Sequence, residues 1–398
     1  GPVHINVPFK EPLYKESEEQ RPLPKIIEEV PASDSMSKER LAVLKKEWQA
    51  AEKKLVLITG YPSNEELKAL VLQLAQQKDV AILAEHTANI FGPNIYNHLD
   101  PILECIPEQQ KADYIPDILV TFGGSVVSKK IKKLFRQHRP KAHWHIDESG
   151  SHIDTYKALT KLIRCTPMCL LEAVAAAATN TAADYSQLWQ QAATRADERH
   201  EQMLQKAGWC DFVVYDEVLK HLPDSTNLQL ANSTPIRYGG IFKMPGDRQF
   251  TINANRGTSG IDGCTSTAVG AALVNNRLTT LITGDIGFFY DSNAFWHHHL
   301  PDNLRVILIN NGGGNIFRII NGPVQMDELH QFETPQERNA KGLAETFGLA
   351  YYFCDNVSDL QAILPKFFQP HEGKCVLLEV KTPAAESAQF LKDYLNVK

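Results

Sequence analysis

Short apolar segments alternate with longer helix-like ones along most of this chain, and this alternation limits the folds that it can adopt. The expected strands are residues 55–60, 80–84, 118–122, 142–146, 227–231, 250–253, 279–283, 305–309, 349–353 and 375–381. The expected helices are residues 37–53, 64–77, 126–138, 263–274, 337–347 and 357–368. Strands that alternate with helices in this way form parallel sheets with helices on their faces. We therefore predict an α/β fold with two doubly wound, mainly parallel-sheet domains.

Changes in composition divide the chain into three expected parts. Residues 16–35 are rich in Glu, Lys, Ser and Pro and lack apolar periodicity, which is typical of a linker. We expect residues 1–34 to be the end of a preceding domain together with this linker. Residues 35–182 are expected to form a central Rossmann-like domain, and residues 183–398 a second α/β domain. The polar segment from 185 to 208 has helical spacing and could bridge the two sheets.

Charge and cysteine content exclude several classes of function. The net charge of -6 at pH 7 provides no basic surface, so we expect neither a nucleic-acid partner nor a membrane partner. The most apolar stretch, residues 167–183, is interrupted by Glu172 and falls short of a membrane-spanning helix. The 7 cysteines are scattered and include no C-x-x-C pair, which argues against a disulfide framework or a zinc site. Reduced thiols and a cytoplasmic location are therefore expected.

Two expected strands each end in a small polar cluster, Gly284–Asp285 after one and Asn310–Gly313 after the other. The carboxyl ends of neighbouring parallel strands meet at one edge of a sheet, so one Mg²⁺ could bridge both clusters. The Asp285 carboxylate, the Asn311 amide oxygen and the Gly313 carbonyl would supply three of the oxygen ligands that this cation prefers. The spacing of Asp285 and Asn311 fits a helical crossover between adjacent strands.

Each cluster by itself has an ordinary structural explanation, because Asp and Asn after strands are common turn and cap residues. Joined at this spacing, they resemble the G-D-x…N-N motif of thiamine-diphosphate enzymes. Ile286 departs from the generic motif, since it stands where a third glycine is usual. An aliphatic residue is usual there in the menaquinone-pathway synthases, one family of these enzymes.

Two longer segments resemble the same synthase family. Residues 253–263, NANRGTSGIDG, are similar to its N-R-G-x-S-G-I-D-G signature, and residues 232–237, NSTPIR, to its N-S-x-P-x-R signature. Residues 1–14 resemble the segment that closes the family's first domain, so the resemblance covers nearly all of the chain. It implies a transferase that decarboxylates 2-oxoglutarate on thiamine diphosphate and adds the resulting carbanion 1,4 to isochorismate. The implied cofactors are thiamine diphosphate and Mg²⁺, or Mn²⁺ in its place.

The resemblance also implies roles for individual residues. Those expected to contact the cofactor are Ser259, Gly260, Ile261, Gly284, Asp285, Ile286, Gly287, Asn311 and Gly313, with Asp285, Asn311 and Gly313 also holding the metal. Ile261 would be the bulky residue over which the cofactor folds, although a plain core isoleucine fits the residue equally well.

Substrate contacts are implied in the same way. Arg237, Arg256 and Ser233 would hold carboxylates, since an arginine matches a carboxylate with a planar, permanently charged fork. Ile316 and Phe317 would wall the substrate pocket, although apolar residues there are often core. Lys130 aligns with a family lysine that reaches the active site, and a solvated basic helix is the alternative for it.

Two other functions stay open at this point. One is another thiamine-diphosphate enzyme, such as a 2-oxoacid decarboxylase or an acetohydroxyacid synthase, for which paired arginines would have no second carboxylate to bind. The other is a non-catalytic nucleotide-binding module. The resemblance also implies that the family's first domain supplies an activating glutamate and that the full-length protein is a homo-oligomer. We therefore expect residues 1–398 alone to be inactive.

Overall fold

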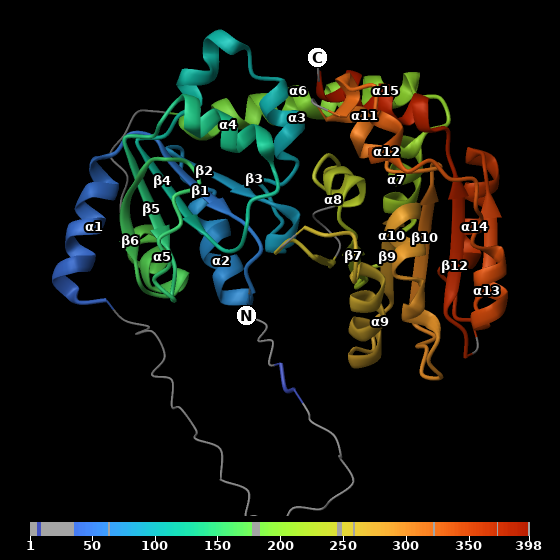
Figure 1. The fold of residues 1–398 in the computed structure, drawn as a ribbon. Helices are drawn as coiled ribbons and strands as arrows, with labels where there is room; N and C mark the ends of the chain where they lie inside the picture. The colour runs from blue at the N-terminus through green and yellow to red at the C-terminus, as the bar shows by residue number, and fades with distance from the viewer. Residues whose placement is uncertain are drawn as a thin grey trace, which may run out of the picture.

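Two parallel sheets, one in each half of the chain, form the frame of the molecule (Figure 1). The computed structural model describes residues 6–8, 36–62, 64–176, 184–244, 249–257, 259–320, 323–371 and 373–396, without the side chain of Val324. Each sheet has 6 strands, and all of the strand pairs are parallel. The predicted α/β fold with two doubly wound sheets is thus confirmed. The expected linker and the expected boundary at residues 182–183 lie outside the described residues.

The first sheet has the strand order β3-β2-β1-β4-β5-β6. Its strands are β1 (Lys54–Ile58), β2 (Val80–Ala84), β3 (Ile95–Tyr96), β4 (Ile118–Phe122), β5 (Ala142–Ile146) and β6 (Leu159–Ile163). Alternate residues of β1 enter two different cores, Val56 and Ile58 on one face and Leu55 and Leu57 on the other. The first core is covered by α1 (Lys38–Ala50), α2 (Glu65–Leu74) and α5 (Pro167–Ala175), and the second by α3 (Leu99–Glu104), α4 (Lys129–Gln137) and α6 (Tyr185–Lys206).

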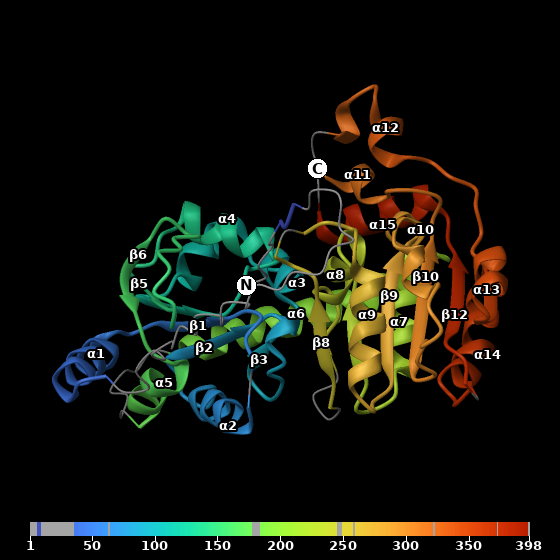
Figure 2. The same cartoon turned by 60° about the horizontal axis from the view of Figure 1, so that its bottom comes forward.

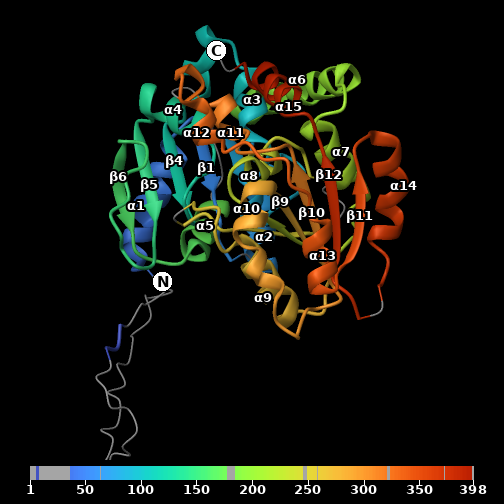
Figure 3. The same cartoon turned by 45° about the vertical axis from the view of Figure 1, so that its right-hand side comes forward.

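The second sheet has the strand order β11-β12-β10-β9-β7-β8. Its strands are β7 (Asn227–Leu230), β8 (Thr251–Ala254), β9 (Thr279–Gly284), β10 (Leu304–Asn310), β11 (Ala350–Cys354) and β12 (Val376–Lys381). One face is covered by α7 (Asp211–His221), α8 (Thr234–Gly239), α11 (Ile316–Ile319), α14 (Val357–Phe367) and α15 (Ala384–Leu395). The other is covered by α9 (Cys264–Val274), α10 (Asp285–Tyr290) and α13 (Lys341–Phe347), and Figure 3 shows both layers.

Helix α6 joins the two halves, as the helical spacing of residues 185–208 predicted. Figures 1 and 2 show it running from the first sheet towards the second. Trp189 is fully buried in the core of the first sheet. His200, further along the same helix, packs against the rings of Phe212 and Tyr394 and shares a hydrogen bond of 2.9 Å with the Tyr394 hydroxyl. The helix therefore contacts both domains, the first through Trp189 and the second through His200.

The two domains also touch directly. The Asn89 amide oxygen accepts a hydrogen bond from the Ile252 N–H at 2.6 Å, and its Nδ2 donates to the Ile252 carbonyl at 3.0 Å. Asn89 thereby extends the hydrogen bonding of the edge strand β8. His86 Nε2 lies 3.0 Å from the Phe242 carbonyl oxygen. Both residues belong to the short 3-10 segment η1 (His86–Ala88) and its cap, which follows β2.

Several short elements were not expected from the sequence. Besides β3 and β6 they include α12 (Leu329–Glu333), η2 (Glu108–Tyr114), η3 (Ser292–Phe295) and η4 (Pro323–Gln325). Helix α4 begins at Lys129 rather than at 126, because Glu85 binds the backbone N–H groups of Val127 and Ser128 and Ser128 caps the helix. None of the helices in the described ranges is long and apolar enough to cross a membrane.

Candidate active site

Asp285 and Asn311 meet at the carboxyl edge of the second sheet. Strands β9 and β10 are hydrogen-bonded neighbours in which Gly284 pairs with Ile309. Asp285 directly follows β9 as the first residue of α10, and Asn311 directly follows β10. Both side chains are buried, at 2% and 8% exposure. The structure therefore brings together the two side chains that the sequence proposes as metal ligands.

The Asp285 carboxylate is surrounded by hydrogen-bond donors. Its Oδ1 accepts from the Ile286 N–H, and its Oδ2 accepts from the Gly313 N–H and from Gln336 Nε2, each at 2.7 Å. Burial raises the pKa of Asp285 to about 6, and these donors oppose that rise. Removal of a carboxylate from water is costly unless a charge partner is supplied. The site is thus suited to a cation.

The loop that follows β10 needs its glycines. Gly312 has a φ of 82°, in the left-handed region, and a Cβ on Gly313 would lie 2.8 Å from the Glu333 carbonyl oxygen. The Gly313 carbonyl accepts from the Asn315 N–H at 2.9 Å and keeps a second lone pair. One carboxylate, one amide oxygen and one carbonyl form a set of hard oxygen donors, which suits Mg²⁺ when phosphate oxygens complete the shell.

Ile261 and Ile286 flank this edge without joining a core. Both side chains are partly exposed, and neither belongs to a hydrophobic cluster of the described residues. A Cβ on Gly287 would lie 3.8 Å from Ile261 Cβ, so Ile261 stands beside the start of α10. The alternative of a plain core isoleucine is therefore not what the structure shows. An apolar side chain in this position is available to contact a ligand.

Two serines of the recognised segments have unusual backbone conformations. Ser233 has a φ of 78° and Ser259 a φ of 66°, where residues with a side chain are uncommon. Such strain costs on the order of 1–3 kcal/mol and is concentrated at functional sites. Thr258, between Gly257 and Ser259, lies outside the described residues.

Asn232 joins the two segments to each other. Its Nδ2 donates to the carbonyls of Asn255 and, at 2.5 Å, Gly260, while its Oδ1 accepts from Arg256 at 3.3 Å. The sequence assigned no role to Asn232, although it is the first residue of the N-S-x-P-x-R segment. The structure thus places this segment, which follows β7, against the one that follows β8.

Arg237 and Arg256 lie near each other close to this edge. Burial lowers the pKa of Arg237, and the charge of Arg256 lowers it further. Arg237 donates to the Ser233 carbonyl at 2.9 Å. The Nε of Arg256 is buried and has no hydrogen-bond partner among the described residues. Two guanidinium groups held together in this way favour an anionic ligand.

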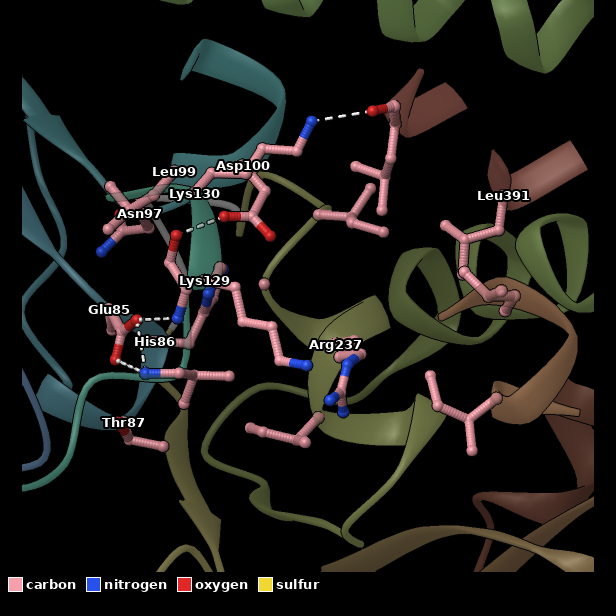
Figure 4. Close-up of a pocket in the computed structure, with 18 of the residues that line it drawn as sticks. Glu85, His86, Thr87, Asn97, Leu99, Asp100, Lys129, Lys130, Arg237 and Leu391 are labelled. Atoms are coloured by element: carbon pink, nitrogen blue, oxygen red, sulfur yellow. Dashed lines mark hydrogen bonds between the residues drawn. The ribbon is translucent and has the colours of Figure 1, made fainter. Parts of the chain in front are cut away.

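A cavity of about 480 Å³ opens between the two domains beside Arg237 (Figure 4). Its polar wall comes mainly from the first domain and includes Glu85, Asp100, Ser128, Lys129 and Lys130, whereas its apolar wall comes mainly from the second and includes Ile236, Ile316, Ile319, Leu391 and Leu395. Glu85 accepts from the Val127 and Ser128 N–H groups, and burial raises its pKa to about 7. The cavity therefore combines charged groups with an apolar surface.

The structure separates the remaining expected pocket residues. Ile316 lines the cavity, whereas Phe317 is not among the lining residues and packs against the Phe332 ring. Lys130 lines it too, but its ammonium group pairs with Glu104 and donates to the Leu395 carbonyl at 2.7 Å. Lys129, on the same wall in Figure 4, makes no ion pair or hydrogen bond through its ammonium group within the described part of the chain. The sequence did not single out Lys129 from its basic neighbours.

Comparisons with known proteins identify the family of the chain and of its two domains. Residues 27–230 match the family model described as the middle domain of thiamine pyrophosphate, and residues 237–380 match the thiamine pyrophosphate enzyme C-terminal TPP binding domain. The chain is 36% identical over 400 residues to a 2-succinyl-5-enolpyruvyl-6-hydroxy-3-cyclohexene-1-carboxylate synthase of Flavobacterium johnsoniae, covering 100% of this chain and 71% of that protein. It is 35% identical over 409 residues to the enzyme of the same name from Porphyromonas gingivalis, covering 100% of this chain and 70% of that protein.

Proposed function

The chain belongs to the 2-succinyl-5-enolpyruvyl-6-hydroxy-3-cyclohexene-1-carboxylate synthase family of thiamine pyrophosphate (thiamine diphosphate) enzymes, and on this premise we propose that it acts on 2-oxoglutarate and isochorismate in menaquinone biosynthesis. The observation that carries the proposal is that Asp285 and Asn311 meet at one edge of the second sheet, where β9 and β10 end. Arg237 and Arg256 lie close to that edge. A transferase that uses a diphosphate cofactor and two acidic substrates needs metal ligands, here Asp285 and Asn311, and cationic side chains, here Arg237 and Arg256.

We assign the metal to Asp285, Asn311 and the Gly313 carbonyl, as Mg²⁺ or Mn²⁺. Buried oxygen donors on adjacent strand ends fit such a cation. Thiamine diphosphate, when bound, supplies the electron sink for loss of CO₂ from a 2-oxo acid. The residues expected to contact it are Gly284, Ile286 and Gly287 on the metal side, and Ser259, Gly260 and Ile261 on the other.

The two arginines orient the acids. Arg237 and Arg256 present guanidinium groups to substrate carboxylates, and Ser233 adds a hydroxyl donor. Their charges neutralise the carboxylates in a partly dry site, where such interactions are stronger than in water. Ile316 offers an apolar surface to a hydrocarbon ring, and Lys129 can approach an acid from the first domain. Lys130, the lysine expected from the sequence, would first have to leave Glu104. Phe317 supports this wall from behind, through its contact with the buried core.

Family membership favours this reading over the two alternatives left open by the sequence. A small apolar oxo acid has no second carboxylate for the arginine pair. A non-catalytic module does not account for a buried guanidinium nitrogen of Arg256 that has no partner among the described residues, nor for the buried Asp285 carboxylate at the same sheet edge. We also propose a cytoplasmic location, because all 7 cysteines are free, as in a reducing compartment, and a homo-oligomer, as the family resemblance implies.

The test is an assay of the full-length protein, with the family's first domain present, on 2-oxoglutarate, isochorismate, thiamine diphosphate and Mg²⁺, followed by measurement of the product mass. We expect a product that contains isochorismate plus the four-carbon unit left from 2-oxoglutarate. Carbon dioxide release without a joined product would instead favour a simple decarboxylase. The inactivity expected of residues 1–398 alone stays a prediction, and product formed by this chain would contradict it.

A further inference from the structure

A buried carboxylate lies directly behind Asn311, and the proposed function gives it no role. Asp211 is the first residue of α7 and is 1% exposed. Its Oδ2 accepts a hydrogen bond from Asn311 Nδ2 at 2.9 Å. No other hydrogen bond of the Asn311 side chain occurs among the described residues. The orientation of the Asn311 amide is therefore set by this contact.

The other oxygen of Asp211 is held by two hydroxyl groups. Its Oδ1 accepts from Thr382 Oγ1 at 2.5 Å and from Ser387 Oγ at 3.1 Å. The Asp211 backbone N–H also donates to Ser387 Oγ at 3.0 Å. Thr382 directly follows β12, and Ser387 lies in α15. Rotation of the Asp211 carboxylate would break contacts with both elements, so the group that faces Asn311 is firmly placed.

The chemistry of an amide determines which atom of Asn311 faces away from Asp211. Its nitrogen donates hydrogen bonds and its oxygen accepts them, so an amide that donates Nδ2 to a carboxylate turns Oδ1 away from it. Metal ions of the Mg²⁺ type bind the oxygen. Donation to a carboxylate also polarises the amide and makes the oxygen a better ligand. We propose that Asp211 is a positioning residue for the metal, which holds Asn311 with its oxygen towards the site. This inference rests on the metal assignment made above.

A purely structural role for Asp211 makes a different prediction. In that case the residue only ties α7 to β12 and α15, and its loss would lower stability without a specific effect on metal binding. Two substitutions separate the roles. Asp211→Asn changes the contact with Asn311 at nearly constant volume. Thr382→Val removes a donor from the opposite oxygen of the same carboxylate and leaves the contact with Asn311 in place.

Asp211→Asn is expected to turn the metal ligand round. Two hydroxyl groups donate on one side of residue 211 and one amide donates on the other. The hydroxyl groups keep donating only when the oxygen of the new amide stays on their side, and in that orientation its nitrogen meets the nitrogen of Asn311. Asn311 must rotate to accept from it, which directs Nδ2 towards the metal. In the double variant Asp211→Asn with Asn311→Asp, the new amide at position 211 donates to the new carboxylate at position 311. The other oxygen of that carboxylate then faces the metal.

The experiment is a calorimetric titration of the protein with Mg²⁺ in the presence of thiamine diphosphate, together with thermal unfolding in the absence of both. We expect Asp211→Asn to weaken the apparent Mg²⁺ affinity by about 10–100-fold, as loss of an outer partner of a metal ligand does. Thr382→Val should lower the unfolding temperature but leave the affinity nearly unchanged. The double variant should recover most of the affinity lost by Asp211→Asn.

Three results would overturn the inference: wild-type Mg²⁺ affinity in Asp211→Asn, an equal loss in Thr382→Val, or no recovery in the double variant. A wild-type protein that shows no Mg²⁺-dependent binding of thiamine diphosphate would overturn the metal assignment, and this inference with it. The wild-type titration therefore tells failure of the proposed function apart from failure of the role given to Asp211.

Discussion

The two sheets share a parallel design but differ at their carboxyl edges. In open parallel sheets, ligands bind where the strand order reverses. In the first sheet this point lies between β1 and β4, and the loops there bind each other: Gly124 N–H donates to the Gly60 carbonyl at 2.8 Å, and Thr59 Oγ1 donates to the Gly124 carbonyl at 2.6 Å. A Cβ on Gly123 would lie 2.7 Å from the Thr59 carbonyl oxygen. The glycines here serve the contact between loops.

In the second sheet the corresponding point lies between β7 and β9, and two charged residues near it, Asp285 and Arg256, form no ion pair among the described residues. Asp285 is a buried anion, and Arg256 has a buried nitrogen with no partner among the described residues. A glycine pair after a strand therefore does not identify a ligand site, since Gly123–Gly124 and Gly312–Gly313 look alike in sequence. What distinguishes them is the group that they contact: Gly124 binds the backbone of Gly60, whereas the Gly313 N–H donates to the buried Asp285 carboxylate. Function thus depends on the loops rather than on the shared fold.

The largest effect is expected from Asp285→Ala. This change removes the anion from the edge of the second sheet and should weaken Mg²⁺-dependent thiamine diphosphate binding by about 3–5 kcal/mol, as loss of one partner from a buried charge pair does. The fold should persist, because the residue stands at a strand end and fills little of the core. Calorimetry of the variant checks the affinity, and circular dichroism the fold. Unchanged cofactor affinity would contradict the metal assignment.

Arg256→Met and Arg237→Met come next. Each should lower kcat/KM with the acidic substrates by roughly 2–4 kcal/mol of transition-state stabilisation, because a charge-assisted contact to a carboxylate is lost. Thiamine diphosphate affinity should barely change, which separates these variants from Asp285→Ala. Steady-state kinetics of the full-length protein, with each substrate varied in turn, provides the measurement. Wild-type rates in both variants would show that neither arginine contacts a substrate carboxylate.

Glu85→Gln tests the polar wall that the first domain contributes to the cavity. Burial holds the pKa of Glu85 at about 7, above its ordinary 4.5, so the folded protein keeps this proton to higher pH than the unfolded chain. Its contribution to stability therefore falls as pH rises from 4.5 to 7 and is level above 7. The substituted glutamine has no such titration, so the free energy of unfolding of Glu85→Gln should rise relative to that of the wild type by roughly 2–3 kcal/mol between pH 4.5 and pH 7. Urea unfolding at pH 5 and pH 8 measures it, and an equal difference at both would refute the shift.

The smallest effect is expected from Gly123→Ala at the edge of the first sheet. Gly123 has a φ of 97°, and the added Cβ would clash with Thr59, so the free energy of unfolding should fall by about 2 kcal/mol. Cofactor affinity should stay at the wild-type value if this edge binds no ligand. Gly342→Ala in α13 is the control, because a Cβ there meets nothing within 4 Å. Weaker cofactor binding in Gly123→Ala would break the distinction between the two edges.

Sequence patterns predicted the two sheets because their strands are buried on both faces and appear as continuous apolar runs, as in β10. Strand β6 was not predicted because it is an edge strand with exposed Thr160 and half-buried Lys161, and β3 was not predicted because it has only 2 residues. The position of Asp285 and Asn311 at the ends of adjacent strands was predictable because their spacing fits a crossover between neighbouring strands. Asp211 and Gln336 were not, because they reach the site only through tertiary contacts with Asn311 and Asp285.

Helix α6 has a consequence for how sequences of this kind can change. Trp189 and His200 anchor the helix in different domains and are separated by about three turns of helix, so they project to nearly the same side. Insertion of one residue between them would advance everything after it by about 1.5 Å and rotate it by about 100°. His200 would then point away from Phe212 and Tyr394. Point substitutions can accumulate on the outer surface of α6. Insertions and deletions between Trp189 and His200 should be strongly selected against, although this stretch lies far in sequence from Asp285 and Asn311.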